Sequence, residues 1–255
     1  MFYEQEGEEV RNYLPLSYGQ YDKIFCSSIF TFSDKSYVTD DMICGGSGFD
    51  LTTVLPSGIE NMKPKINIGF TMRGCIRDCP FCIVPQKEGK VRVVGDIYDF
   101  WDRESWTITI LDNNILALPD HFLEICNQIR DNSLAVDFNQ GLDARLITDE
   151  IAHYLNTIRH SKQIRIAWDL MKDEKQIKEG IRHLITYFNP HRIMCYVLVG
   201  FNTTEEEDLY RVEYLKSLNI DPFVMPYNKN PLYKKFVRWC NRKEICESVS
   251  WKDYK

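Results

Sequence analysis

The sequence predicts an α/β protein whose main part is an open partial (β/α)6 barrel, preceded by a short N-terminal cap. Apolar, β-branched runs alternate with amphipathic helical patterns from residue 106 onward, which is typical of a parallel sheet with right-handed crossovers. The centres of successive runs lie roughly 28 to 30 residues apart, which is the length of one strand–helix unit. Six strands in about 160 residues are too few for a closed eight-stranded barrel, which needs about 250 residues.

Six segments are expected to be strands because apolar and β-branched residues dominate them. They are residues 65–71, 106–112, 134–139, 164–169, 193–200 and 221–227. The first lies about 41 residues ahead of the second, so the connection between them carries extra chain. In such a sheet the chemistry belongs at the carboxyl ends of the strands, and the extra chain begins at that end.

Four segments between the later strands repeat apolar residues at helical spacing. They are residues 119–131, 148–160, 173–188 and 203–218. Pro119 stands near the start of the first segment, where proline is favoured, and Thr148 is the expected N-cap of the second. Thr203 and Glu206 have the spacing of a capping box at the start of the fourth.

The rest of the chain is less regular and defines the predicted boundaries. Residues 22–32 and 42–51 have the composition of short strands, so the N-terminal region is interpreted as a reduced α/β cap. The predicted parts are the cap (1–60), the barrel (61–228) and a C-terminal helical extension (229–255). In residues 229–243, lysines and arginines alternate with aromatic residues. This pattern indicates either a local RNA-binding patch or the solvated face of an amphipathic helix.

The composition narrows the class of protein. The chain has 255 residues, 44% hydrophobic and 27% charged, as in ordinary soluble domains. A net charge of −6 argues against broad, non-specific binding to nucleic acid. No apolar signal region and no run of about 18 apolar residues is visible, so a cytoplasmic protein with no membrane partner is expected. The nine cysteines, an odd number, fit a reducing compartment, and Cys126 and Cys195 are expected in the core.

Three cysteines lie close together in the stretch RGCIRDCPFC. Cys75, Cys79 and Cys82 have the spacing C-x3-C-x2-C in a polar, glycine-containing segment, which argues against plain packing. A structural zinc site needs a fourth ligand, and a redox C-x-x-C motif normally has no third cysteine just before it. A 4Fe–4S cluster held by three thiolates leaves one iron open to a reacting ligand. The residues by themselves leave all three kinds of site open.

The cysteine stretch resembles the cluster motif of the radical S-adenosylmethionine superfamily, including an aromatic residue, Phe81, before the last cysteine. The resemblance extends over residues 64–227. It implies that Cys75, Cys79 and Cys82 bind a 4Fe–4S cluster whose open iron chelates S-adenosylmethionine. It also implies reductive cleavage of that cofactor to a 5′-deoxyadenosyl radical, which abstracts hydrogen from a substrate. An electron donor of the flavodoxin or ferredoxin type follows from the same resemblance.

The resemblance also assigns further residues to the cofactor. The segment LDNN stands where the family usually has a glycine-rich segment, and it is similar to cobalamin-linked and methylthiotransferase-like branches. Arg145 is expected to bind the carboxylate of the cofactor, because a guanidinium matches that group bidentately. The full set expected around the cofactor is Phe81, Asp112, Asn113, Asn114, Asn139, Gln140, Arg145, Asp169, Val199 and Gly200. No catalytic residue is assigned.

Departures from those branches restrict the reaction. Only Cys26 and Cys44 precede the motif, whereas methylthiotransferases carry three further cysteines, and a cobalamin-binding D-x-H-x-x-G motif is absent. The C-terminal segment resembles the ends of small radical proteins of phages and mobile elements, which names no substrate. The expectation is a radical enzyme acting on a small molecule or on RNA or protein. The alternative is a non-catalytic iron–sulfur or zinc protein in which the cysteine loop is structural.

Overall fold

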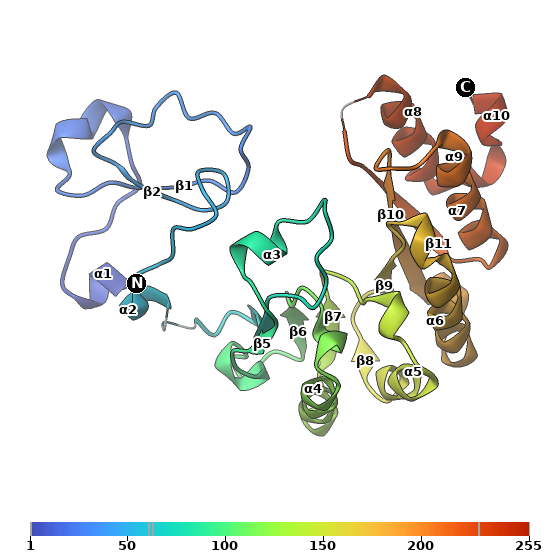
Figure 1. The fold of residues 1–255 in the computed structure, drawn as a ribbon. Helices are drawn as coiled ribbons and strands as arrows, with labels where there is room; N and C mark the ends of the chain where they lie inside the picture. Colours follow the sequence, from blue (N-terminus) through green and yellow to red (C-terminus); the bar gives the residue numbers. More distant parts are fainter. Residues whose placement is uncertain (1, 61, 63, 229, 255) are drawn as a thin grey trace. The chain divides into compact units, whose positions relative to one another are not determined.

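The computed structural model describes residues 2–60, 62, 64–228 and 230–254 (Figure 1). The chain divides into two units, Met1–Pro64 and Lys65–Lys255, and each is described by itself. Residues 61 and 229, which begin two of the predicted parts, lie outside the described residues.

The second unit is built on parallel strands. One sheet has the order β3-β6-β7-β8 and the other the order β11-β10-β9, and every pairing in both is parallel. The strands are β3 (Ile68–Gly69), β6 (Thr107–Ile110), β7 (Ala135–Phe138), β8 (Arg159–His160), β9 (Ile164–Ala167), β10 (Ile193–Val199) and β11 (Asp221–Pro226). A parallel bridge between Leu142 and Ile166 joins the two sheets. Among the described strands, β3 and β11 do not pair, so the sheets do not close. The prediction of an α/β protein with parallel strands is confirmed.

Two predicted segments differ from the structure. The strand predicted at 65–71 pairs only over β3, and Asn67 just before it has a φ of 64°, which interrupts the extended chain. The helix predicted at 148–160 ends at Asn156, because Arg159 and His160 pair with β7 as strand β8. Apolar spacing alone does not separate a helix end from a short buried strand.

Four helices cover the strands of the second unit (Figure 1). They are α4 (Pro119–Asp131), α5 (Asp149–Asn156), α6 (Glu174–Tyr187) and α7 (Glu205–Ser217). Thr148 caps α5 as predicted, accepting a hydrogen bond from the Ile151 amide. The capping box of α7 is formed by Thr204 and Glu207, so its prediction one residue earlier is wrong. The segment TTEEE offers the same spacing in both registers, and only the start of the helix decides between them.

The core of the second unit lies between these helices and the strands. Ile108, Val136, Ile166 and Val197 of the strands are at most 1% exposed. Cys126 and Cys195 are fully buried in the same core, which confirms their prediction as packing residues. Burial raises the pKa of Cys126 to about 12, so this thiol is inert at neutral pH.

The C-terminal part consists of short helices. They are α8 (Pro231–Cys240), α9 (Lys243–Ser248) and α10 (Trp251–Tyr254). On α8 the aromatic residues Phe236 and Trp239 are buried, whereas Lys234, Lys235 and Arg238 are exposed. This is the arrangement of an amphipathic helix with a solvated basic face. The buried rings offer no surface on which a base could stack.

The first unit contains few regular elements. They are α1 (Phe2–Gln5), the 3-10 helix η1 (Pro15–Gln20), β1 (Phe25–Ser27), β2 (Ile43–Gly45) and α2 (Ser57–Glu60). Strands β1 and β2 lie within the predicted segments 22–32 and 42–51 and pair in parallel, with Cys26 opposite Cys44. Of the described helices in either unit, none is long and apolar enough to cross a membrane.

Candidate functional site

The cysteine loop follows β3 and is closed at its neck by an antiparallel pair, β4 (Met72–Arg73) and β5 (Arg92–Val93). Gly74 opens the loop with a φ of 77°, and a Cβ there would lie 2.4 Å from the Lys90 carbonyl oxygen. Only glycine combines this conformation with so close an approach. The Gly74 amide donates a hydrogen bond of 3.0 Å to the Glu88 carboxylate. The loop, which contains the short helix α3 (Val84–Lys87), therefore starts and ends at a fixed neck.

All three cysteines of this loop line one cavity of about 240 Å³. Segments that follow β6, β7 and β9 supply the other walls, so the cavity lies at the carboxyl ends of parallel strands. Six more of the residues expected at the cofactor line it: Phe81, Asn113, Asn114, Gln140, Arg145 and Asp169. Four do not: Asp112, Asn139, Val199 and Gly200. Three charged residues that the sequence analysis did not single out also line it: Arg77, Asp143 and Asp173.

The thiols differ from ordinary exposed cysteines. Burial raises the pKa of the Cys79 and Cys82 thiols, so both stay protonated at neutral pH until a metal displaces the proton. The Cys75 Sγ accepts a hydrogen bond of 3.3 Å from the Arg77 amide. Within the part of the chain that the structure describes, no three or more His, Cys, Asp or Glu side chains are grouped as metal ligands. The thiols therefore share a cavity without converging on one point.

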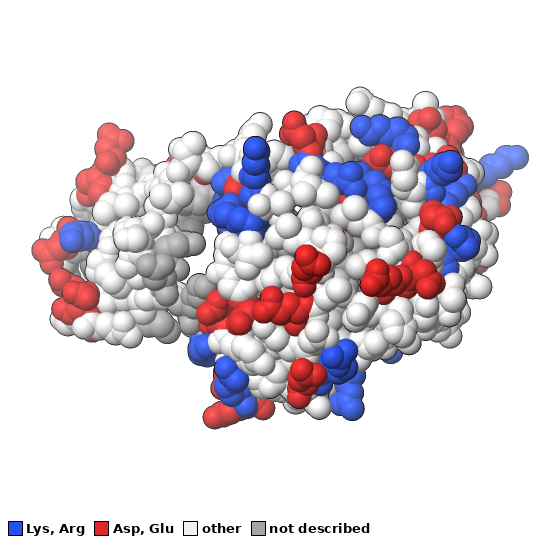
Figure 2. All heavy atoms as spheres, turned by 60° about the horizontal axis from the view of Figure 1, so that its bottom comes forward, with Lys and Arg blue, Asp and Glu red and all other residues white. Residues whose placement is uncertain are grey.

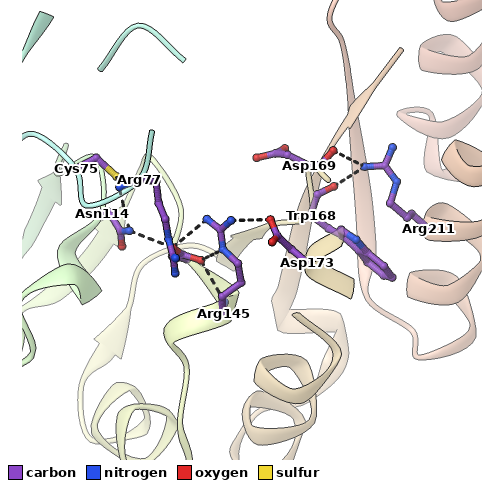
Figure 3. A network of polar contacts seen from close by, with 9 residues as sticks. Cys75, Arg77, Asn114, Arg145, Trp168, Asp169, Asp173 and Arg211 are labelled. Atoms are coloured by element: carbon purple, nitrogen blue, oxygen red, sulfur yellow. Dashed lines mark hydrogen bonds and ion pairs between the residues drawn. The ribbon is translucent and has the colours of Figure 1, made fainter. Parts of the chain in front are cut away.

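Asp143 is the centre of an ionic network, and Figure 3 labels its partners Arg77, Asn114 and Arg145. Its side chain is 6% exposed and accepts hydrogen bonds from Arg77 Nε at 2.9 Å and Asn114 Nδ2 at 3.2 Å. Arg145 donates to it twice, through Nε at 2.6 Å and Nη2 at 3.1 Å. Burial opposes ionisation of Asp143, but pairing with Arg145 and Arg77 outweighs it and lowers the pKa. The network joins the cysteine loop to the ends of β6 and β7.

Arg145 is therefore already paired in this structure. Besides Asp143, it donates through Nη1 to Asp173 at 2.7 Å. A guanidinium has five N–H donors, and these contacts use three of them. Two donors are left for a ligand in the cavity. The cavity is lined by two arginines, 77 and 145, and three aspartates, 143, 169 and 173, so it has no excess of positive charge.

Asp169 supplies a carboxylate whose ionisation is disfavoured. Burial raises its pKa to about 6, although the nearby Arg211 charge opposes this effect. Arg211 of α7 is fully buried and donates to the carbonyl oxygens of Trp168 at 2.7 Å, Asp169 at 3.1 Å and Leu198 at 2.8 Å. In Figure 3 the Asp169 carboxylate points away from Arg211, toward the side of Arg145 and Cys75. Arg211 thus holds the carbonyl groups at the ends of β9 and β10 together, and the Asp169 carboxylate faces the cavity.

Among the described residues that line the cavity, Asn114 has the only buried side-chain oxygen or nitrogen without a partner. Its Oδ1 is buried without a hydrogen bond to any described group, whereas its Nδ2 is bonded to Asp143. A buried amide oxygen without a partner costs free energy unless something donates to it. Asn113 beside it donates to the Glu88 carboxylate at 2.6 Å, at the neck of the cysteine loop.

Asp112 does not line the cavity. It is 4% exposed and accepts hydrogen bonds from the amides of Thr71 at 2.8 Å and Met72 at 3.1 Å. The Thr71 hydroxyl also donates to Asp112 and lies 3.0 Å from Nε2 of His121. These contacts hold the chain where β3 leads into β4, so Asp112 stabilises the segment from which the cysteine loop starts.

Val199 and Gly200 do not line the cavity either. Val199 is fully buried, and the Gly200 amide donates to the Asp208 carboxylate at 3.1 Å. A Cβ on Gly200 would lie 2.4 Å from the ring of Tyr233, and its φ of 76° also requires glycine. Asn139 is exposed beyond the cavity lining. No protein-family model matches this chain, and a search of curated proteins finds no match either.

Proposed function

We propose that the chain is a radical S-adenosylmethionine enzyme on an open partial (β/α)6 barrel, to which the two-residue strand β8 is an addition. The observation that carries the proposal is the shared cavity: three thiols of one loop, closed at its neck by β4 and β5, face one space at the carboxyl ends of the strands. Parallel α/β proteins bind ligands at that end. The bridge between Leu142 and Ile166, which joins the two sheets, supports the continuous curved sheet that a partial barrel needs.

Cys75, Cys79 and Cys82 would hold a 4Fe–4S cluster through their thiolates. When bound, such a cluster supplies the electron that cleaves S-adenosylmethionine, and the radical released abstracts hydrogen from a substrate. The donor set fits the cluster, because thiolate sulfur is its usual ligand and the three thiols already face one cavity. Loading requires the loop to bring them closer together and to release their protons.

The other residues of the cavity suit the polar groups of S-adenosylmethionine. The unpartnered Asn114 Oδ1 can accept from its amino group, and the two unused donors of Arg145 can bind its carboxylate. Asp169 can accept from the ribose hydroxyls. Because carboxylates outnumber guanidiniums in the lining, a cationic sulfonium is not repelled.

Phe81 is one of the apolar residues that line the cavity. Its ring lies 5.3 Å from the ring of Phe201, in an edge-to-face arrangement. Apolar wall residues of this kind suit a site that must exclude water from a reactive radical. The substrate class stays open between a small molecule and RNA or protein. The buried rings of α8 favour the small molecule over RNA stacked on residues 229–243.

The proposal is tested by anaerobic reconstitution with iron and sulfide. The purified full chain should bind about four irons, and S-adenosylmethionine should alter the electron paramagnetic resonance spectrum of the reduced cluster. With dithionite it should form 5′-deoxyadenosine. The Cys79→Ala variant should lose all three signals, and Cys44→Ala, which removes a thiol of the first unit, should keep them.

Two results contradict the enzyme. One zinc per chain with no iron uptake would identify a structural zinc loop. A stable cluster whose spectrum S-adenosylmethionine does not change, and which forms no 5′-deoxyadenosine, would identify a non-catalytic iron–sulfur protein.

A further inference from the structure

A second cavity, of about 490 Å³, lies at the amino ends of the strands of the second unit. Trp106 immediately precedes β6, Ala135 begins β7, Arg159 begins β8 and Arg192 immediately precedes β10, and all four line this cavity. The cysteine cavity lies at the carboxyl ends of the same strands. The two cavities are therefore at opposite ends of the sheet, and nothing in the proposed function uses the second one.

Trp106 is the unusual residue of this cavity. It is 72% exposed, whereas the other four tryptophans, all within the described residues, are at most 7% exposed. A large exposed aromatic ring in a concave surface marks a place where a ligand can pack. His160 and Phe188 also line the cavity, and their contacts hold them in place: the two rings lie 5.7 Å apart, and His160 Nε2 lies 2.8 Å from the Leu155 carbonyl oxygen.

The charge of the cavity has one sign. Arg159 and Arg192 line it, and no Asp or Glu is among its lining residues as described. Arg192 Nη2 makes one long contact, 3.4 Å, with the His160 carbonyl oxygen. No described group forms a hydrogen bond or ion pair with the Arg159 guanidinium. Two arginines with unused donors, and no carboxylate among the described lining residues, form a site for a small anion such as a phosphate.

The sheet register sets the backbone spacing between the strands that carry the ring and the charge. Thr107, Ala135 and Arg159 lie in one row across β6, β7 and β8. Neighbouring strands are about 4.8 Å apart, so the backbones at Trp106 and Arg159 are on the order of 10 Å apart. A nucleotide spans such a distance, with its base at one end and its phosphate at the other.

We propose that this cavity binds a nucleotide, with the base stacked on Trp106 and the phosphate held by Arg159 and Arg192. The nucleotide can be free or can belong to single-stranded RNA. Lys, Arg, Asp and Glu are interspersed on the face seen in Figure 2, with no continuous basic field. Recognition therefore rests on a few stacked and paired groups rather than on a long phosphate track.

Binding is measured with the full chain, using AMP, inorganic phosphate and a short oligoadenylate as probes. Calorimetric titration measures the affinity of every variant. In the wild type, quenching of tryptophan fluorescence also reports on Trp106 selectively, because the other four rings are buried. Trp106→Ala should weaken AMP binding on the order of tenfold, and Trp106→Phe should restore most of the affinity. The double variant Arg159→Gln with Arg192→Gln should abolish phosphate binding. Arg182→Gln, which removes an exposed arginine of α6 outside the cavity, is the control and should bind like the wild type.

The outcomes separate the two sources of the nucleotide. Tighter binding of oligoadenylate than of AMP, with the same loss in the variants, assigns the site to single-stranded RNA. Equal binding of the two assigns it to a free nucleotide. Absence of saturable AMP and oligoadenylate binding in the millimolar range, or affinities unchanged in the Trp106→Ala and double arginine variants, would overturn the proposal. Since none of these measurements needs iron, their failure is independent of the radical chemistry.

Discussion

Asp143→Asn is the substitution that most directly tests the ionic network. The carboxylate accepts from Arg77, Arg145 and Asn114, and so connects the cysteine loop to the segments after β6 and β7. Asparagine keeps the shape but removes the charge and one acceptor. The two arginines then lose their strongest common partner, although Arg145 keeps Asp173.

The expected cost follows from burial. Removing one partner of a fully buried ion pair costs about 3–5 kcal/mol. The Arg77 and Arg145 side chains are 33% and 21% exposed, so water recovers part of that cost. We expect a loss of about 1–3 kcal/mol in the free energy of unfolding at pH 7. The control Asp131→Asn removes a carboxylate that is 69% exposed beside Arg130, and it should cost at most about 0.5 kcal/mol.

The loss of stability in Asp143→Asn should depend on pH. The folded-state pKa of Asp143 is lowered, so its stabilisation is present above the unfolded pKa, near 3.9, and is lost as the pH falls through the lower folded value. Protonated Asp143 resembles asparagine. The deficit of the variant should therefore be constant between about pH 5 and pH 7 and should shrink below about pH 4.

Urea unfolding followed by tryptophan fluorescence provides the assay, because all five tryptophans lie in the second unit. A deficit that stays the same at low pH, or one no larger than that of Asp131→Asn, would refute the argument. The same variant should also bind iron about tenfold or more weakly after reconstitution, since Asp143 orients the loop that carries the ligands.

Three further predictions concern single features of the second unit. Gly180→Ala should destabilise it by about 1–3 kcal/mol, because the new Cβ would lie 1.9 Å from the Ala144 carbonyl oxygen. At exposed Lys175 of the same helix, alanine should instead be more stable than glycine by about 1 kcal/mol. If alanine were more stable than glycine at both positions in urea unfolding, the packing at Gly180 would be contradicted. Thr204→Ala should cost about 0.5–2 kcal/mol through loss of the α7 cap, and no measurable cost would place the cap elsewhere. Iron uptake in competition with a chelator should rise from pH 7 to pH 9, because the raised pKa values of Cys79 and Cys82 leave both thiols protonated at the lower pH. Iron uptake that does not change with pH would show that these thiols are not the ligands.

The strands and helices were predictable because their signals are local. Apolar periodicity located the six main strands and α4 through α7, and Pro119 and Thr148 marked two helix starts. The register of the α7 cap and the short strand β8 were not predictable. The first depends on which of two adjacent threonines begins the helix, and the second on pairing with β7, which lies more than twenty residues earlier.

The candidate site was predictable only in part, for a related reason. The three cysteines form a local pattern, and so does the run of polar residues after the second strand. The pairing of Arg77 with Asp143 joins residues 66 positions apart, and no spacing rule reveals it. Asp143 does carry a weak signal, since it stands two residues before Arg145 as the N-cap of the 3-10 helix η4 (Ala144–Leu146). Asp112, a carboxylate at a strand end that was expected at the cofactor, accepts hydrogen bonds from the backbone amides of Thr71 and Met72, and no local pattern in the sequence indicates these contacts.

The two cavities lie at opposite ends of the same parallel strands. Strand β7 serves both cavities: the segment after Phe138 lines the cysteine cavity, and Ala135 lines the second one. Four residues of extended chain separate those ends by roughly 13 Å, and the buried side chains of the core fill the space between them. Substitutions more than about 10 Å apart without shared partners usually act additively. Arg159→Gln should therefore leave iron uptake unchanged, and Cys79→Ala should leave AMP binding unchanged; a coupled loss in the double variant would mean that the sheet transmits strain from one end to the other.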